Sequence, residues 1–181
     1  ELVLVDDKSD KIEAANAVTR LVEKEKVVAI IGSSISGNTL AGGPIAEKAG
    51  VPIVSPTATN PLVTQGKKYI FRVCFIDPFQ GEMAAKYAYE TLKKRKAALI
   101  IDKAQDYCVG LADFFEKNFT RLGGQIVAKT YCQTGDKDFT AQMSAIKAKN
   151  PDVLYMPNYY TEVALAMKQA KDLGLNVPVI S

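Results

Sequence analysis

The chain has 181 residues, of which 48% are hydrophobic and 24% are charged, and its formal net charge is +3. These values are typical of a globular protein with a core of its own, arranged as one domain or two small ones. The sequence contains no histidine, which excludes Ser-His-Asp and Cys-His catalysis and metal sites built on histidine. The three cysteines lack metal-ligand spacing, so we expect free, buried or half-buried thiols, with one disulfide left open as an alternative.

The basic residues do not indicate a nucleic-acid surface. They are scattered except for Lys93-Lys94-Arg95-Lys96, which we interpret as a solvated helix end because no aromatic residues are interleaved with it. No stretch approaches the roughly 20 apolar residues of a membrane span, and no signal peptide is seen. Because the chain opens directly on an apolar run, we expect a processed chain or a fragment.

Short apolar runs alternate with amphipathic stretches along the whole sequence, which predicts strands alternating with helices. Asp10 is the expected N-cap of the first helix, and Gly50 ends the second. The predicted strands are residues 2–5, 27–31, 51–54, 69–75, 97–101, 126–131, 153–156 and 177–180. The predicted helices are residues 10–24, 36–49, 78–94, 107–122, 138–149 and 160–173.

This alternation indicates an α/β protein with parallel sheets that are covered by helices on both faces. The pattern starts afresh after an extended segment near residue 76. We therefore predict two doubly wound parallel-sheet lobes, with residues 1–76 forming lobe 1 and residues 77–181 forming lobe 2. In open parallel sheets, ligands bind beyond the carboxyl ends of the strands.

Two segments rich in small hydroxyl residues fall at such strand ends: residues 32–36 (Gly-Ser-Ser-Ile-Ser) and residues 55–61 (Ser-Pro-Thr-Ala-Thr-Asn-Pro). Each follows an apolar run that is expected to be a buried strand, and the first also opens a helix. Free backbone N–H groups and the helix dipole favour an anion there, so two such loops side by side predict a site for one small carboxylate. The alternative is an ordinary helix cap at Ser36 and turn chemistry in residues 55–60.

Four aspartates in the second half offer a competing hypothesis of metal binding or acid–base catalysis. Asp102, Asp106, Asp136 and Asp138 lie in separate predicted loops without metal-loop spacing. We interpret Asp138 as a helix N-cap and the others as solvated residues, and we expect no metal and no cofactor. A flavodoxin-like enzyme is disfavoured because the chain lacks a GxGxxG motif and a nucleophile elbow.

The order and spacing of several motifs resemble the branched-chain amino-acid (Leu/Ile/Val-type) periplasmic binding proteins, which are the receptors of ABC importers and have a type I two-lobed fold. The motif at residues 55–61, which follows a predicted strand, is fairly specific for this family. Each of the other motifs is a weak indication when taken alone. The motifs are Ile31-Gly32 with the serines that follow, Ile53 to Pro61, Phe71-Arg72-Val73, Gln80-Gly81, Asp102-Lys103 with Tyr107, Asp138-Phe139-Thr140 and Tyr159-Tyr160.

The resemblance implies a set of ligand-binding residues. Ser36 and Thr59 are implied to donate to the α-carboxylate of the ligand, and the carbonyl of Thr57 to accept from its ammonium group. Ala58 belongs to the same loop, and Ile35 is implied to line the side-chain pocket. Tyr107 and Tyr159 are implied to close over the ligand from lobe 2. The alternatives are half-buried loop tyrosines and, for Ile35, simple core packing.

The resemblance also implies a function. We expect a receptor that binds a branched-chain or other small amino acid and delivers it to an ABC permease, without an enzymatic step, in the periplasm or outside the cell, with or without a lipoprotein anchor. Family members begin with a further strand and helix and extend further at the other end, so lobe 1 is expected to be incomplete, with homo-oligomerisation or domain swapping as a result. A ligand-sensing receptor domain of the same fold and a fragment that no longer transports remain alternatives.

Overall fold

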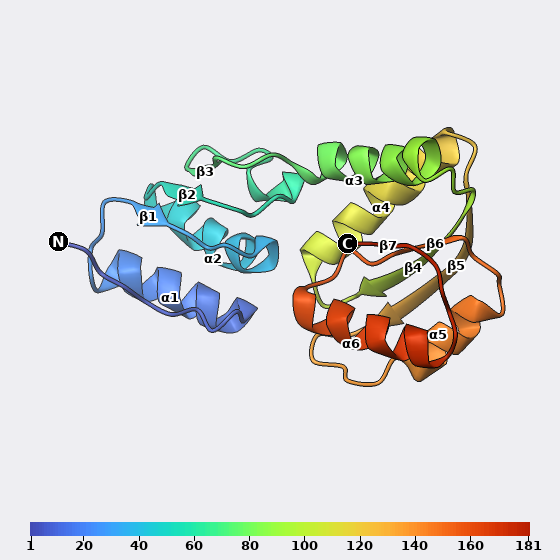
Figure 1. Ribbon diagram of the computed structural model, residues 1–181. Coiled ribbons are helices and arrows are strands. Elements are labelled where there is room, and N and C mark those ends of the chain that lie inside the picture. The colour runs from blue at the N-terminus through green and yellow to red at the C-terminus, as the bar shows by residue number, and fades with distance from the viewer. The chain divides into compact units, whose positions relative to one another are not determined.

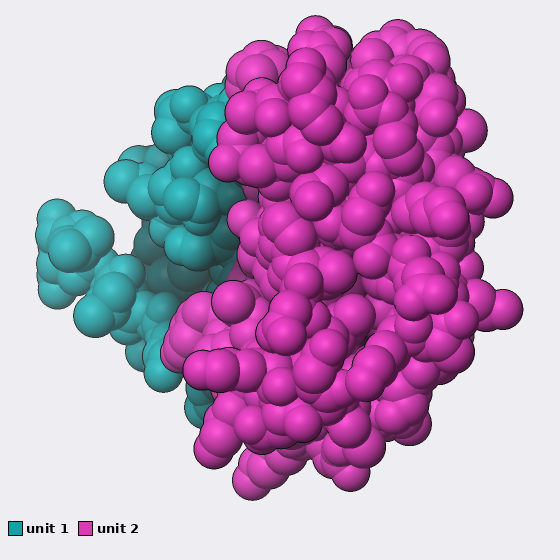
Figure 2. Space-filling model, turned by 45° about the vertical axis from the view of Figure 1, so that its right-hand side comes forward, with its two compact units in different colours: residues 1–76 teal, residues 77–181 magenta.

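The computed structural model describes residues 1–181, which divide into two compact units. Unit 1 comprises Glu1–Ile76 and unit 2 comprises Asp77–Ser181 (Figure 2). Each unit is an α/β structure around a parallel sheet of its own.

Unit 1 contains a three-stranded parallel sheet in the order β1-β2-β3, formed by Ile30–Ile31, Ile53–Ser55 and Ile70–Arg72 (Figure 1). Two helices, α1 (Lys11–Glu23) and α2 (Ser36–Ala49), and the 3₁₀ helix η1 (Pro61–Val63) complete it. The core of the unit gathers Ile30, Ala46, Ile53, Ala58, Val63 and Ile70.

The two helix ends that were predicted from capping residues in unit 1 are confirmed. The Asp10 carboxylate accepts hydrogen bonds from the backbone N–H groups of Ile12 and Glu13, at 2.8 and 3.0 Å, and so caps α1. Helix α2 spans the predicted residues and ends at Gly50, whose φ of 70° lies in the left-handed region that glycine adopts without steric cost.

Two strand predictions in unit 1 are wrong. Residues 2–5 form no strand, and Leu2 and Leu4 are 88% and 90% exposed. The apolar run supplies β propensity, but a strand also requires a neighbour to share backbone hydrogen bonds, and this run has none in the sheet. The expected buried strand at 27–31 shrinks to two residues, and Ile31 is 86% exposed, because β1 is an edge strand that pairs only with β2.

Unit 2 holds a four-stranded parallel sheet in the order β5-β4-β6-β7. The strands are β4 (Lys96–Asp102), β5 (Gln125–Cys132), β6 (Val153–Tyr155) and β7 (Val179–Ile180). The helices are α3 (Asp77–Lys86), the π-helix η2 (Tyr87–Thr91), α4 (Asp106–Arg121), α5 (Thr140–Lys147) and α6 (Tyr160–Asp172).

Strand β4 separates two cores in unit 2, because successive side chains of a strand point to opposite faces. Ala97, Leu99 and Ile101 face α3 and α4 together with the buried rings of Phe115 and Phe119. The intervening residues Ala98 and Ile100 face the other way, where Met143, Ile146, Ala166 and Ala170 of α5 and α6 cover the sheet. Figure 1 shows the two helix pairs on opposite sides of this sheet. The predicted doubly wound arrangement is therefore present in unit 2.

Two helix predictions in unit 2 need correction. The helix predicted over 78–94 is α-helical only to Lys86 and continues as the π-helix η2, and it ends because Lys93 adopts a positive φ of 56° that turns the chain toward β4. Asp138 is not the N-cap of α5. Its carboxylate accepts from the backbone N–H of Thr140 at 2.9 Å, but the N-cap position belongs to Phe139, one residue later.

Candidate functional site

The two hydroxyl-rich loops lie side by side because they leave neighbouring parallel strands. Ile31 of β1 is in register with Val54 of β2. Each strand then continues into its loop at the carboxyl edge of the sheet. One loop runs through residues 32–35 into α2, and the other runs through residues 56–60 into η1. Within unit 1, the sequence-predicted residues of these loops are thus brought to one edge of the sheet.

Hydrogen bonds between the two loops fix their relative position. The Ser55 hydroxyl, which is completely buried, donates to the carbonyl of Ser33 at 2.6 Å. The Thr57 hydroxyl donates to the carbonyl of Ser34 at 2.8 Å. The Ser36 hydroxyl accepts from the backbone N–H of Asn60 at 3.2 Å. These three bonds join the loops along their length, so the edge is organised by the protein alone.

The Ser36 and Thr59 hydroxyls differ from those of Ser55 and Thr57 in that neither donates a hydrogen bond within the protein. Both residues are buried. The Thr59 hydroxyl has no hydrogen-bond partner within the protein. Because leaving such a group buried without a partner costs about 1–3 kcal/mol, a partner from outside the chain would offset a real penalty. The Ser36 hydroxyl accepts from Asn60, next to Thr59 in sequence, and retains its own proton as a donor.

The remaining loop residues have distinct environments. Ala58 is completely buried and its backbone N–H donates to the Ser55 hydroxyl at 3.1 Å. Thr57 is exposed, and Ile35 is half-buried at the N-cap position of α2. Ala58 therefore packs in the core of unit 1, whereas Thr57 and Ile35 are accessible to solvent.

The alternative of ordinary cap and turn chemistry accounts for part of this edge. Helix α2 has no side-chain cap, so Ser36 is not a capping residue. Turn chemistry does explain Asn60, whose side chain accepts from the Leu62 N–H at 3.0 Å, and Ser55, which accepts from Ala58. It does not explain Thr59.

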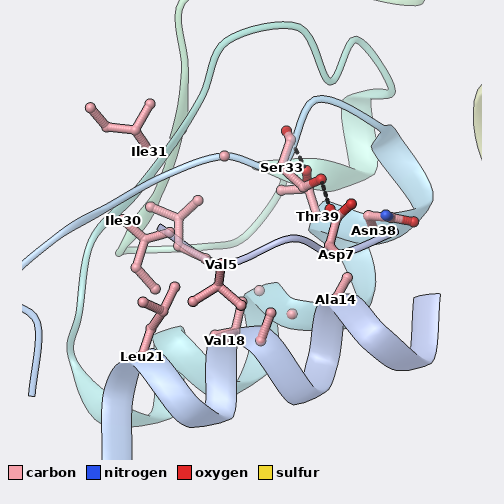
Figure 3. Close-up of a pocket in the computed structure, with 15 residues that line it drawn as sticks. Val5, Asp7, Ala14, Val18, Leu21, Ile30, Ile31, Ser33, Asn38 and Thr39 are labelled. Atoms are coloured by element: carbon pink, nitrogen blue, oxygen red, sulfur yellow. Dashed lines mark hydrogen bonds between the residues drawn. The ribbon is translucent and has the colours of Figure 1, made fainter. Parts of the chain in front are cut away.

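A cavity of about 80 Å³ lies next to the first loop. It is lined by residues of α1, α2 and β1 and of the segment that contains Asp7. Figure 3 shows Asp7 and Thr39 meeting Ser33 there: the Ser33 hydroxyl donates to the Asp7 carboxylate, and the Thr39 hydroxyl donates to the Ser33 carbonyl at 3.0 Å. Burial acts to raise the pKa of the Asp7 carboxyl, but hydrogen bonds from the Ser33 hydroxyl and the Ser9 N–H act against it, and the pKa is lowered.

The two predicted tyrosines lie together in unit 2. Tyr107 in the first turn of α4 and Tyr159 at the N-cap of α6 stack with ring centroids 5.7 Å apart and an interplanar angle of 24°. The Gln80 side-chain amide donates to the Tyr107 hydroxyl at 3.1 Å. Burial raises the pKa of both phenols, so both stay neutral at physiological pH. Each therefore offers an apolar ring and a neutral hydroxyl.

A buried polar network lies at the neighbouring strand ends and includes Asn158, the residue before Tyr159. The Asn158 side chain accepts from the backbone N–H of Asp102 at 3.2 Å and donates to the Cys132 sulfur at 3.5 Å. Asp102 is buried, and its carboxylate accepts from the Thr134 hydroxyl at 2.5 Å and from the Ala104 N–H at 2.8 Å. The prediction that Asp102 is solvated is therefore wrong, because the backbone and hydroxyl donors at this strand end compensate its burial.

The comparison with protein families decides the identity of the fold. The family of periplasmic binding proteins matches residues 1–181. The chain belongs to this family. The predicted family and its type I fold are thereby confirmed.

Three relatives show how far the similarity extends. A leucine-specific-binding protein of Salmonella typhimurium is 36% identical over 94% of this periplasmic binding protein chain and 46% of its own length. The crystal structure of a leucine-binding protein from Thermotoga maritima has a TM-score of 0.97 and 50% identity, covering 99% of this chain and 51% of that one. A branched-chain amino acid transporter substrate-binding protein of Streptococcus pneumoniae, in complex with isoleucine, has a TM-score of 0.91 and 39% identity, covering 99% and 51%. The chain thus spans about half the length of the relatives it matches.

Three cysteines are free in this periplasmic binding protein, as predicted: Cys74 is half-buried, and Cys108 and Cys132 are buried. Burial, reinforced by nearby carboxylates, raises the pKa of Cys108 strongly and that of Cys132 to about 12. Both buried thiols are therefore protonated and unreactive at neutral pH. No helix of the structure has the length and apolar character needed to cross a membrane.

Sequence reasoning missed three residues that hold the site residues in place. Asn158 and Gln80 support the tyrosines, and Arg72 binds the loop that carries Thr59. Gln80 and Arg72 stand in motifs that resemble the family, but the residue types gave no indication of which backbone atoms they contact. Asn158 directly precedes Tyr159, and its position after a buried strand was its only signal.

Proposed function

We propose that this chain supplies the carboxylate-binding edge of a receptor for a small amino acid of the leucine, isoleucine and valine class. The observation that carries the proposal is the Thr59 hydroxyl, which is buried without a partner on the loop whose Asn60 N–H donates to the Ser36 hydroxyl. The names and the bound isoleucine of the relatives support the class of ligand.

The chemistry of the edge suits a carboxylate better than a neutral or cationic group. The Thr59 and Ser36 hydroxyls are free to donate, and hydrogen bonds to a charged acceptor are about twice as strong as neutral ones. The start of α2, which contains Ser36, adds the favourable end of the helix dipole. Because the loops are already joined, little ordering of the protein accompanies binding.

The remaining roles follow from the family. We propose that the carbonyl of Thr57 accepts from the ligand ammonium group, that Ile35 contacts the ligand side chain, and that Tyr107 and Tyr159 contact the ligand from unit 2. The receptor would work in the periplasm or outside the cell and pass its ligand to an ABC permease, with no chemical step. Homo-oligomerisation or domain swapping stays a prediction, and a monomer in light scattering would contradict it.

Ligand analogues test the proposal directly on the 181-residue chain. Thermal unfolding is measured with L-leucine, L-isoleucine and L-valine, and with L-leucinamide, which keeps the side chain and ammonium group but lacks the carboxylate. An amino acid at 100 times its Kd is expected to stabilise the protein by about 2.7 kcal/mol. L-leucinamide is expected to have no effect. Equal stabilisation by L-leucinamide would refute the carboxylate site, and no response to any amino acid would refute the proposed function.

A further inference from the structure

The Arg72 side chain reaches from β3 to the loop that follows β2. Its Nη1 donates to the carbonyls of Ala58 at 3.1 Å and Asn60 at 2.7 Å. Its Nη2 donates to the carbonyl of Pro61 at 3.1 Å and to the hydroxyl of Thr64 at 2.6 Å. All four contacts of the guanidinium fall on residues 58–64, so one side chain holds the end of the loop and its continuation through η1.

The strand register explains how this contact arises. Arg72 is the last residue of β3 and pairs with Ser55, the last residue of β2, directly before the loop. The side chain therefore starts at the base of the loop and needs to span only a short distance. Its partly buried position shields the four hydrogen bonds from competing water.

The contact uses properties that are specific to arginine. A guanidinium presents five N–H donors in a rigid planar fork, whereas a lysine ammonium is a compact charge on a flexible chain. The acceptors on the loop are three carbonyls and one hydroxyl, spread over both terminal nitrogens. Lysine would keep the charge and lose the ability to hold several acceptors at once.

We propose that Arg72 is a positioning residue for the carboxylate site. Two of the carbonyls it binds, those of Ala58 and Asn60, belong to the residues on either side of Thr59. Fixing both neighbours holds the backbone of Thr59, from which its hydroxyl projects. This inference rests on the proposed function for its effect on ligand affinity, but not for its effect on the loop.

The charge of Arg72 adds a second, separable contribution. None of its four acceptors is a carboxylate, so these contacts leave the guanidinium charge without a counter-charge. A positive charge behind the loop attracts an anion bound at the loop. Arg72→Lys removes the fork and keeps this charge, whereas Arg72→Gln removes both.

The test combines hydrogen–deuterium exchange and L-leucine titration on the 181-residue chain. In Arg72→Lys, exchange of the backbone N–H groups of the non-proline residues in 56–64 is expected to accelerate roughly tenfold or more. L-leucine affinity is expected to fall roughly tenfold. Both effects come from the loss of hydrogen bonds to a charged donor. Arg72→Gln is expected to weaken affinity further. Arg20→Lys is the matched control, because Arg20 lies on α1 of the same unit and pairs with Glu25, and it should change neither quantity.

Each outcome decides a separate question. Unchanged exchange at residues 56–64 in Arg72→Lys overturns the inference, whether or not the unaltered chain binds L-leucine. Acceleration that spreads through α1 as well makes Arg72 a general support of the fold and also overturns it. Faster loop exchange with full L-leucine affinity overturns the link to the site. If the unaltered chain does not bind L-leucine, the proposed function fails, and the exchange result alone decides the role of Arg72.

Discussion

Replacing Thr59 by valine should make the protein more stable and a poorer binder at the same time. Valine has nearly the same shape as threonine and lacks only the hydroxyl. In the structure that hydroxyl is buried without a partner, so its removal relieves a penalty of about 1–3 kcal/mol. In a domain the size of unit 1, a gain of about 1 kcal/mol raises Tm by about 4–8 °C.

The same substitution should reduce ligand affinity. A hydrogen bond to a charged acceptor contributes about 1.5–3 kcal/mol, so the Kd for L-leucine should rise about 10- to 100-fold. Thermal unfolding without ligand gives the first quantity, and isothermal titration with L-leucine gives the second. Opposite signs of the two effects are the expected signature, because a residue with a purely structural role does not gain stability when it loses its polar group.

Thr19→Val provides the matched control. The Thr19 hydroxyl on α1 already donates to the carbonyl of Ala15 at 2.8 Å, so its loss should not raise Tm and should leave L-leucine affinity unchanged. The reasoning about Thr59 is refuted if Thr59→Val lowers Tm and binds L-leucine as well as the unaltered chain does.

Three further predictions concern packing, thiol reactivity and pH. Gly81→Ala should destabilise unit 2 by about 1–3 kcal/mol in denaturant unfolding, because the new Cβ would lie 2.6 Å from the Cβ of Phe114. Alkylation of the folded protein at pH 8, followed by mass spectrometry, should label Cys74 and spare the other two cysteines, which are buried with raised pKa values. The Asp7 pKa is lower in the folded state than its usual 3.8, so the unfolded chain binds this proton first. Stability from the contact with Ser33 should persist above pH 3.8 and be lost as the pH falls below it, and Asp7→Asn should flatten this part of the pH profile.

Controls for these predictions come from the same chain. Gly43→Ala should be tolerated, because its new Cβ would meet only Ile70 atoms at 3.8 Å and alanine favours a helix over glycine. Equal losses in the free energy of unfolding from Gly43→Ala and Gly81→Ala would contradict the packing argument. Labelling of all three cysteines before unfolding would contradict the burial argument, and an unfolding profile that Asp7→Asn leaves unchanged between pH 5 and pH 3 would contradict the role of Asp7.

The parts of the fold that follow from local sequence were predictable. Helix α2 has the predicted bounds because Gly50 stops it through its own backbone conformation. Strands β4 and β5 each extend one residue beyond the prediction at both ends, because an apolar run defines β4 and β-branched and aromatic residues define β5. The placement of the loop hydroxyls at one edge of the sheet could be predicted, because their position after parallel strands depends on the order of elements alone.

The parts that depend on contacts between distant segments were not predictable. The run at residues 2–5 has the composition of a strand, yet whether it pairs is decided by what lies beside it. Asp102 has the sequence context of a solvated loop residue, and its burial depends on Thr134, 32 residues away. The contacts of Arg72 depend on the path of a loop that begins on a different strand.

The hydroxyls at the edge of the unit 1 sheet form two pairs that differ in the groups to which they donate. The Ser55 and Thr57 hydroxyls donate hydrogen bonds to carbonyls of the other loop. The Ser36 and Thr59 hydroxyls donate to no group of the protein. Under the proposed function, a substitution at Thr59 alters recognition and keeps all three hydrogen bonds between the loops, whereas one at Ser36 also removes the bond from Asn60. Thr59 is thus the position of the proposed site at which recognition can change without loss of a contact between the loops.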